Sequence, residues 1–400
     1  MTLDIAVVGT GAAPDDPGQE GFAMAYKHAE GYRRLDDCRL VACADIVREN
    51  AEKFASRYDL DGVYEEYETM LSEANPDVVS VTVPPAVHAD IVTGCARVGD
   101  LAAIHCEKPM ATTWADCREM VERCEAEGVQ LTINHQRRVG PTYVRAKELL
   151  EDGAIGDLER VEISARNLFD AGSHVFHLAG YYTDWATPEW VISQLDYRAE
   201  NRWFGAHNEN QAVAQWQYDD GVTGLAATGA GSDGIGCYVR LVGTGGRIEV
   251  GADGGPPLRV RHGRTLGWKR IHTDENMWGD TALPTWKAAI AKASRTLPGL
   301  PDDPFGSPSH IERAIETVVE SVRSGEPCPL DAELALQSTE LIFASWESAR
   351  SRGRVDLPLA IEDNPLEDLV ERGLVPAGRD AEAGNDPDAL ADPRPQTDDD

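Results

Sequence analysis

Positive charge is scarce in this sequence of 400 residues. It contains 37 lysine and arginine residues against 69 aspartate and glutamate residues, which gives a net charge of −32. Nucleic acid is excluded as a partner, since its recognition requires a basic surface. Only seven of the basic residues are lysines, and the excess acid is spread along the chain. This pattern is typical of halophilic proteins, in which high salt screens self-repulsion; an acidic protein from another source is the alternative.

Long apolar runs and paired cysteines are also missing. No apolar run approaches the roughly 18 residues of a membrane span, so we expect no membrane-spanning helix. The eight cysteines contain no CxxC pair, and no secretory signal precedes the first predicted strand. We therefore expect a cytoplasmic protein with reduced thiols. The length predicts two domains with appendages.

The first part of the chain alternates short apolar strands with helical stretches. This alternation predicts right-handed βαβ units, a parallel sheet and a first domain over residues 1–138. The predicted strands are residues 4–8, 40–44, 78–83, 102–106 and 130–133. The predicted helices are residues 21–35, 48–58, 67–73, 89–97 and 114–127.

The pattern changes near residue 140, where a second domain over residues 139–360 begins. Longer strand-like runs with hairpin signals at Asp219-Asp220-Gly221 and Gly243-Thr244-Gly245-Gly246 indicate an antiparallel sheet. The predicted strands are residues 158–166, 211–218, 223–228, 237–243, 247–250 and 258–261, and the predicted helices are residues 141–151, 308–324 and 331–352. Residues 361–400 are acidic, and their composition predicts a disordered tail.

A strand that runs directly into a Gly-x-Gly turn marks a candidate nucleotide site. Residues 5–8 lead into Gly9-Thr10-Gly11, and a helix follows. Glycines permit a tight turn and close approach of a pyrophosphate, while the amino terminus of the helix offers free N–H groups. An apparent insertion after Ala13 displaces the third glycine of the motif, whose role falls to Gly21 or Ala25.

The second predicted strand ends in an acidic residue, Asp45. A carboxylate there binds the adenosine ribose hydroxyls and repels a 2′-phosphate, which favours NAD over NADP. Arg48 would partly compensate that repulsion. An ordinary turn followed by a helix-capping aspartate is the alternative interpretation.

Lys108 follows the predicted strand 102–106, within the segment Glu107-Lys108-Pro109. Because the carboxyl ends of parallel strands line the ligand crevice, Lys108 should point at the bound molecule. An ammonium there holds a substrate hydroxyl and lowers its pKa, whereas a surface lysine in an ordinary turn is the alternative. Pro84 fixes another loop over the crevice, and a helix begins near His88.

The order of these motifs resembles the Gfo/Idh/MocA oxidoreductase family. The resemblance covers roughly residues 3–360 and includes the pattern Asp170-x-x-x-His174. It implies an α/β Rossmann domain with a parallel sheet, followed by an α+β domain with a large open antiparallel sheet. It also implies hydride transfer between NAD(P) and a carbon of a sugar, cyclitol or related polyol. The wide sheet face of this fold suits pairing into a homo-oligomer, a dimer or a tetramer.

The resemblance also assigns roles to individual residues. Lys108, Asp170 and His174 fall on the family's catalytic lysine, aspartate and histidine. Arg137 or Arg138 falls where the family often contacts cofactor or substrate, and we expect a cis Lys108–Pro109 bond. The expected cofactor contacts are Gly9, Thr10, Gly11, Asp45, Pro84, His88, Glu107, Lys108 and Pro109.

The chemistry of these side chains is coherent by itself. Oxidation of a secondary alcohol requires loss of the hydroxyl proton while a hydride leaves the same carbon. His174 is suited to be the general base, because histidine titrates near neutral pH. Lys108 would stabilise the developing alkoxide, and Asp170 would orient the hydroxyl or the imidazole. Nicotinamide carries the hard step, so no metal is expected.

His177 stands where the family commonly has an acid. On a helix it would share a face with His174, so it contacts substrate or is a satisfied core histidine. A third interpretation is a metal site formed by Asp170, His174 and His177. The aromatic-rich stretch 181–204 suits either the faces of sugar rings or a core or subunit interface.

Three functions stay open on this sequence. The leading hypothesis is an NAD-dependent sugar or polyol dehydrogenase. The alternatives on this fold are an NAD-dependent glycosidase that acts by transient redox and a non-catalytic regulator that senses nucleotides or sugars. The presence of Lys108, Asp170 and His174 together argues against the regulator, because a sensor needs none of them.

Overall fold

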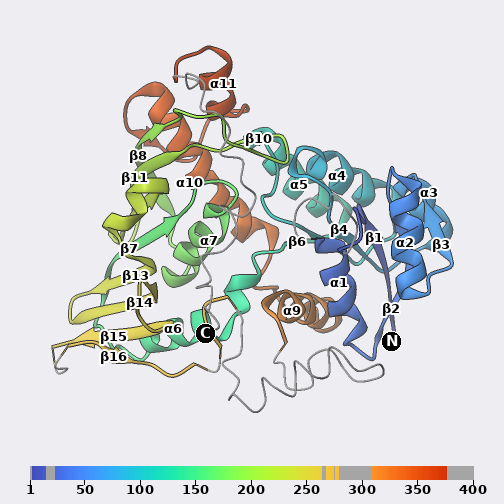
Figure 1. Cartoon of the computed structure of the whole chain (residues 1–400), viewed down its shortest axis with the longest axis horizontal. Coiled ribbons are helices and arrows are strands. Elements are labelled where there is room, and N and C mark those ends of the chain that lie inside the picture. The colour runs from blue at the N-terminus through green and yellow to red at the C-terminus, as the bar shows by residue number, and fades with distance from the viewer. Residues whose placement is uncertain (1, 15–22, 264–266, 274, 279–307, 376–400) are drawn as a thin grey trace, which may run out of the picture.

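The computed structural model describes residues 2–14, 23–263, 267–273, 275–278 and 308–375. Within these residues the chain builds two large sheets, one of six strands and one of nine, each packed with helices (Figure 1). The predicted fold class is confirmed: a Rossmann domain with a parallel sheet precedes an α+β domain with a larger, mostly antiparallel sheet. None of the described helices is long and apolar enough to cross a membrane.

The first sheet is parallel throughout, with the strand order β3-β2-β1-β4-β5-β6. Its strands are β1 (Leu3–Val8), β2 (Cys38–Ala44), β3 (Gly62–Tyr64), β4 (Val78–Val81), β5 (Ala103–Cys106) and β6 (Gln130–Ile133). The sequence analysis does not predict β3, which is too short to show a pattern. The strand order reverses between β1 and β4, so a ligand crevice opens at their carboxyl ends.

The helices of this domain agree closely with the predicted ones. They are α1 (Met24–Arg33), α2 (Arg48–Tyr58), α3 (Tyr67–Ala74), α4 (His88–Val98) and α5 (Trp114–Glu127), with the 3-10 helices η1 (Pro85–Val87) and η2 (Gln136–Val139). The helix after the Gly-x-Gly turn begins later than expected, at Met24, and buries Ala25. Gly21 lies outside the described residues.

The second sheet has the strand order β16-β15-β14-β13-β7-β12-β11-β8-β17 and contains one parallel pair, β7–β12. Its strands are β7 (Leu158–Ala165), β8 (Pro188–Asp196), β11 (Gln211–Tyr218), β12 (Thr223–Thr228), β13 (Cys237–Gly243), β14 (Gly246–Ala252), β15 (Leu258–His262), β16 (Lys269–Arg270) and β17 (Val355–Asp356). A separate short pair joins β9 (Arg202–Trp203) and β10 (Ala206–His207). The sequence analysis does not predict β8, which lies inside the aromatic-rich stretch.

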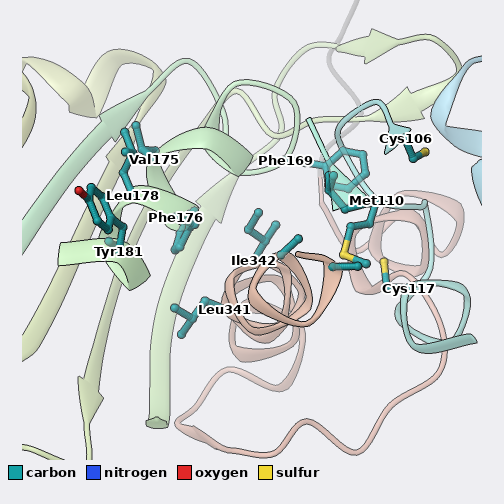
Figure 2. Packing of buried hydrophobic residues seen from close by; sticks show 14 of the residues in the cluster. Cys106, Met110, Cys117, Phe169, Val175, Phe176, Leu178, Tyr181, Leu341 and Ile342 are labelled. Carbon is teal, nitrogen blue, oxygen red and sulfur yellow. The ribbon is translucent and has the colours of Figure 1, made fainter. Parts of the chain in front are cut away.

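Two helices from late in the chain tie the domains together. The second domain contributes α6 (Pro141–Glu151), α7 (Gly172–Tyr182), α9 (His310–Ser324) and α10 (Ala332–Ser351). α9 returns to the first domain and packs on α1, while α10 packs on both α7 and α5. Figure 2 shows Ile342 of α10 between Phe176 of α7 and Met110 of the first domain. The two domains therefore share one hydrophobic cluster.

The tail predicted from residue 361 onward begins too early. Residues 361–375 belong to the folded molecule and contain the helix α11 (Pro365–Glu371). The Asn364 side chain accepts hydrogen bonds from the backbone N–H groups of Leu366 and Glu367, and Leu366 and Leu369 are buried. The acidic composition of residues 361–400 as a whole does not reveal these two buried leucines, which is why the predicted tail is too long. Residues 376–400 lie outside the described residues.

Candidate active site

Lys108 and Asp170 form an ion pair between the two domains. Lys108 follows β5, and Asp170 lies in the loop between β7 and α7. The ammonium Nζ donates to Asp170 Oδ1 at 2.8 Å and to the Asp170 carbonyl oxygen at 3.1 Å. The Lys108 side chain is 19% exposed and that of Asp170 10%. Lys108 is thus held at the carboxyl end of β5 with part of its side chain exposed.

Glu107 is buried behind Lys108. Its Oε1 accepts a hydrogen bond from Asn134 Nδ2 at 2.6 Å and lies 2.8 Å from His28 Nε2, and its Oε2 accepts from the backbone N–H of Lys108 at 3.2 Å. Burial alone raises the pKa of Glu107, but the hydrogen bonds to His28 and Asn134 and the charge of Lys108 outweigh it and lower this pKa to about 2. Glu107 therefore fixes the backbone that carries the lysine.

The sequence predicts that His88 contacts the cofactor. In the structure, however, both ring nitrogens of His88 face backbone carbonyl groups. The ring is fully buried, with Nε2 at 2.8 Å from the Val83 carbonyl and Nδ1 at 2.8 Å from the Pro109 carbonyl. Burial lowers the pKa of His88, and the contacts with the backbone carbonyls of Val83, Pro109 and Met110 oppose this effect. The expected cis Lys108–Pro109 bond is confirmed. His88 thus links the loop after β4 to the loop that carries Lys108.

His174 lies in the first turn of α7 and is nearly fully buried. The turn requires Gly172, because a Cβ there would lie 2.5 Å from the Asn167 carbonyl oxygen. Burial, together with the charges of Arg137 and Lys108, holds the pKa of His174 well below its ordinary value. The imidazole is therefore neutral at neutral pH. The Asp170 carboxylate binds Lys108, so the alternative in which it orients the imidazole is not what the geometry shows.

Three histidines gather beside the ion pair. His135 follows β6, and its ring stacks on His177 with centroids 4.3 Å apart and stands edge-on to His174 at 5.7 Å. His177 in turn meets Trp185 at 4.9 Å. Burial lowers the pKa of His135 to about 3, and the charge of Lys108 adds to this effect. His135 is absent from the predicted site residues, although its place at the carboxyl end of a parallel strand is a signal of a ligand site.

The metal interpretation of Asp170, His174 and His177 finds no geometric support. Asp170 is engaged by Lys108, and His177 packs between two aromatic rings. In the part of the chain that the structure describes, no group of three or more His, Cys, Asp or Glu side chains is placed to hold a metal ion.

The two arginines of η2 lie on aromatic faces. The Arg137 guanidinium lies 4.7 Å from the ring centroid of Tyr238 and 4.4 Å from that of Trp278. The Arg138 guanidinium lies 3.2 Å from the ring centroid of Tyr181. Of the two, Arg137 is close enough to lower the pKa of His174. Arg137 is therefore the better placed of the pair to meet a substrate.

The Gly-x-Gly turn has the shape that a dinucleotide requires. Gly9 and Gly11 have φ angles of 86° and 63°. Asp45 Oδ2 accepts hydrogen bonds from Gly11 N at 2.8 Å and from Thr10 Oγ1 at 3.1 Å, so the acid at the end of β2 also braces the turn. A Cβ at Gly11 would meet nothing within 4 Å, which leaves room for close approach of a pyrophosphate. The exposed Pro84 begins the neighbouring loop. These residues fit NAD.

Comparison with known families accounts for both domains. Residues 3–135 match the model described as oxidoreductase family, NAD-binding Rossmann fold, and residues 147–357 match oxidoreductase family, C-terminal alpha/beta domain. The chain belongs to the Gfo/Idh/MocA oxidoreductase family. NAD is the cofactor of this family's Rossmann domain, in agreement with the turn at Gly9 and Gly11.

Two curated relatives are named as dehydrogenases of apiose and of inositol. D-apiose dehydrogenase from Paraburkholderia graminis is 33% identical over 159 residues, which cover 40% of this chain and 42% of that protein. Inositol 2-dehydrogenase from Gluconacetobacter diazotrophicus is 32% identical over 206 residues, 51% of this chain and 54% of that protein. The chain thus spans about half the length of the curated relatives it matches. The structure of an NAD binding oxidoreductase from Klebsiella pneumoniae shares the fold, with a TM-score of 0.70, 19% identity and coverage of 90% of this chain and 100% of that one.

Proposed function

We propose that this protein is an NAD-dependent oxidoreductase that transfers a hydride between the nicotinamide and a secondary alcohol or carbonyl carbon of a sugar, cyclitol or related polyol. The observation that carries the proposal is the Lys108–Asp170 pair at 2.8 Å, in which an ammonium from the Rossmann domain meets a carboxylate from the second domain. A neutral His174 lies beside it. The similarity to proteins named for apiose and inositol supports the polyol class.

Each side chain has a defined task in this reaction. Lys108 donates a hydrogen bond to the reacting hydroxyl, and its charge stabilises the alkoxide that forms. His174 accepts the hydroxyl proton, because burial keeps its imidazole neutral. Asp170 holds the ammonium in place through two hydrogen bonds. When bound, NAD accepts the hydride from the same carbon.

We propose NAD rather than NADP as the cofactor. The Asp45 carboxylate lies at the end of β2, where it binds ribose hydroxyls and repels a 2′-phosphate. Arg48 does not compensate this repulsion, because its guanidinium is engaged by Glu52 at 2.8 Å and by Glu65 at 3.5 Å.

The direct test is a panel of sugars, cyclitols and sugar acids with NAD or NADP at several salt concentrations, read by the absorbance of reduced nicotinamide. With the best substrate, Lys108→Met should lower kcat by roughly a hundred- to a thousandfold, the loss expected for one group that stabilises developing charge. The affinity for NAD should stay near wild type, since Lys108 acts on the substrate.

Lys147→Met is the matched control. Lys147 also pairs with an aspartate, since its Nζ lies 2.5 Å from Asp184 Oδ1. It should keep wild-type turnover. Substantial activity in the Lys108 variant would contradict the assignment. Cleavage of a glycoside without net NADH would indicate the transient-redox glycosidase, and NAD binding without turnover of any compound would indicate a regulator.

We also propose a homo-oligomer, a dimer or a tetramer, that works in a reducing, cytoplasmic and salt-rich environment. The open face of the nine-stranded sheet exposes Ile192 of β8 and Val213 of β11, each at 46%, which suits subunit pairing. All eight cysteines are free thiols. Light scattering after gel filtration measures the oligomeric state, and Val213→Lys should shift it toward the monomer.

A further inference from the structure

Glu209 is a fully buried carboxyl that the reaction above does not use. It lies between β10 and β11. Its Oε1 accepts hydrogen bonds from the backbone N–H of Leu168 at 2.6 Å and from the hydroxyl of Thr228 at 3.0 Å, and its Oε2 accepts from the indole Nε1 of Trp346 at 3.2 Å. These three donors are neutral, so no counter-ion is among its hydrogen-bond partners.

The contact with Leu168 connects Glu209 to the candidate active site. Leu168 lies two residues before Asp170 in the loop that leads into α7. The neighbouring Asn208 accepts a hydrogen bond from the backbone N–H of Asp170 at 3.2 Å. Asn208 and Glu209 therefore hold the 168–170 loop at both of its ends, and this loop supplies the carboxylate that binds Lys108.

We propose that Glu209 is a positioning residue for the reaction: its ionised carboxylate fixes the 168–170 loop, and through it the Lys108–Asp170 pair, and protonation releases that loop. The proposal rests on the function proposed above. A carboxylate accepts from all three donors, whereas a protonated acid presents an O–H that requires an acceptor. The N–H groups of Leu168 and Trp346 only donate, so among these three partners the Thr228 hydroxyl alone can accept the added proton, and it then no longer donates to Oε1. Protonation therefore changes the set of bonds that the carboxylate accepts.

The charged and titratable groups on the elements around Glu209 have other partners. His207 of β10, two residues before Glu209, lies 3.5 Å from Glu367 Oε2. On the loop before α7, Asp170 is paired with Lys108. The strand β12 carries no charged residue. On α10, Glu347 is paired with Arg350, and Glu340 accepts a hydrogen bond from the backbone N–H of Leu359.

The titration ranges of Glu209 and the general base differ. Burial raises the pKa of Glu209 to about 7, although its hydrogen bonds oppose this rise. Burial lowers the pKa of His174 well below its ordinary value. A loss of activity as the pH falls through neutrality is therefore expected from Glu209, and a loss at lower pH from His174.

The first experiment compares the pH dependence of kcat/KM in wild type, Glu209→Gln and Glu340→Gln. Wild type should lose activity below a midpoint near 7. Glu209→Gln should lack this midpoint and be about tenfold less active on the alkaline side, because its amide N–H meets another donor. Glu340→Gln is the matched control: burial also raises the pKa of Glu340, and its Oε1 accepts from the Leu359 N–H at 2.7 Å, so both the midpoint and the activity should be kept.

The second experiment requires no substrate. Amide hydrogen exchange of the peptide 168–174, corrected for the intrinsic pH dependence of exchange, measures how firmly the backbone of this loop is fixed. Its protection should fall as the pH falls through 7 in wild type and in Glu340→Gln, and should be low and independent of pH in Glu209→Gln. Unchanged protection across this range, or a wild-type pH midpoint in Glu209→Gln, overturns the inference. If the hydrogen exchange follows the expected pattern but the protein turns over no substrate, the inference about Glu209 stands and the proposed function is overturned.

Discussion

At the scale of single residues, Glu107 stabilises the loop that carries Lys108. Its pKa is lowered to about 2 from an ordinary value of 4.5, so the folded state binds fewer protons than the unfolded state between these values. The resulting stabilisation is fully present above pH 4.5 and is lost as the pH falls toward 2. It amounts to about 3 kcal/mol at neutral pH.

Glu107→Gln should therefore lower the free energy of unfolding at neutral pH, and the difference from wild type should shrink as the medium is acidified. Denaturant titrations at a series of pH values measure both quantities. A difference that stays constant with pH would show that Glu107 stabilises the loop by packing and not by its charge.

Some residues of the candidate site can be predicted from the sequence, and others cannot. The pattern of Glu107, Lys108, Asp170 and His174 predicts that these side chains share one site, but it assigns Asp170 to the substrate hydroxyl or the imidazole and does not predict its bond to the Lys108 ammonium. It did not predict His135 or Glu209, because their importance lies in partners distant in the chain. The stacking of His135 on His177 exists only once the two domains have packed together, and the bond from Leu168 to Glu209 joins two segments of the second domain that are 41 residues apart.

At the scale of elements, the Gly-x-Gly turn offers two glycines with different surroundings. A Cβ at Gly9 would lie 2.4 Å from Val83 Cγ1 and 2.9 Å from the Val83 backbone N, whereas a Cβ at Gly11 would meet nothing within 4 Å. Gly9→Ala should lower the stability of the cofactor-free protein by about 2–4 kcal/mol, because both strain and a clash arise.

Gly11→Ala should lower that stability by only about 1 kcal/mol, the cost of a left-handed backbone for alanine. It should nevertheless weaken NAD binding, since its methyl group enters the space assigned to the pyrophosphate. Thermal unfolding without NAD and calorimetric titration with NAD separate the two effects. Equal losses of stability, or normal NAD affinity in Gly11→Ala, would contradict this reading of the turn.

Helices and strands with a regular spacing of apolar residues can be predicted from the sequence. Elements whose position depends on pairing or packing with distant segments cannot. The boundaries of α2, α5, α6, β11 and β12 agree with the sequence, because apolar spacing and turn residues define them locally. The strand β8 was missed, since its aromatic residues suggested a binding surface. The parallel pairing of β7 with β12 was also missed, because strand order depends on the path of the chain between them.

At the scale of the whole molecule, the net charge of −32 acts against the compact state. Added KCl should raise the midpoint of urea unfolding, most steeply at low salt, where each increment shortens the range of repulsion most. The variant Glu66→Gln, Asp100→Asn, Glu159→Gln removes three exposed acids and should be more stable at low salt and less sensitive to KCl. If the stability of the wild-type protein does not respond to salt, repulsion between its acidic residues does not contribute appreciably to the free energy of unfolding.

The docking of α10 against both α5 and α7 has a consequence for when the protein becomes competent. The Rossmann domain completes its turn for the dinucleotide from its own strands, but the lysine meets its carboxylate only after the second domain closes over it. A chain in which only the first domain has folded can therefore hold the dinucleotide turn but lacks both Asp170 and His174. The proposed reaction requires both domains in place.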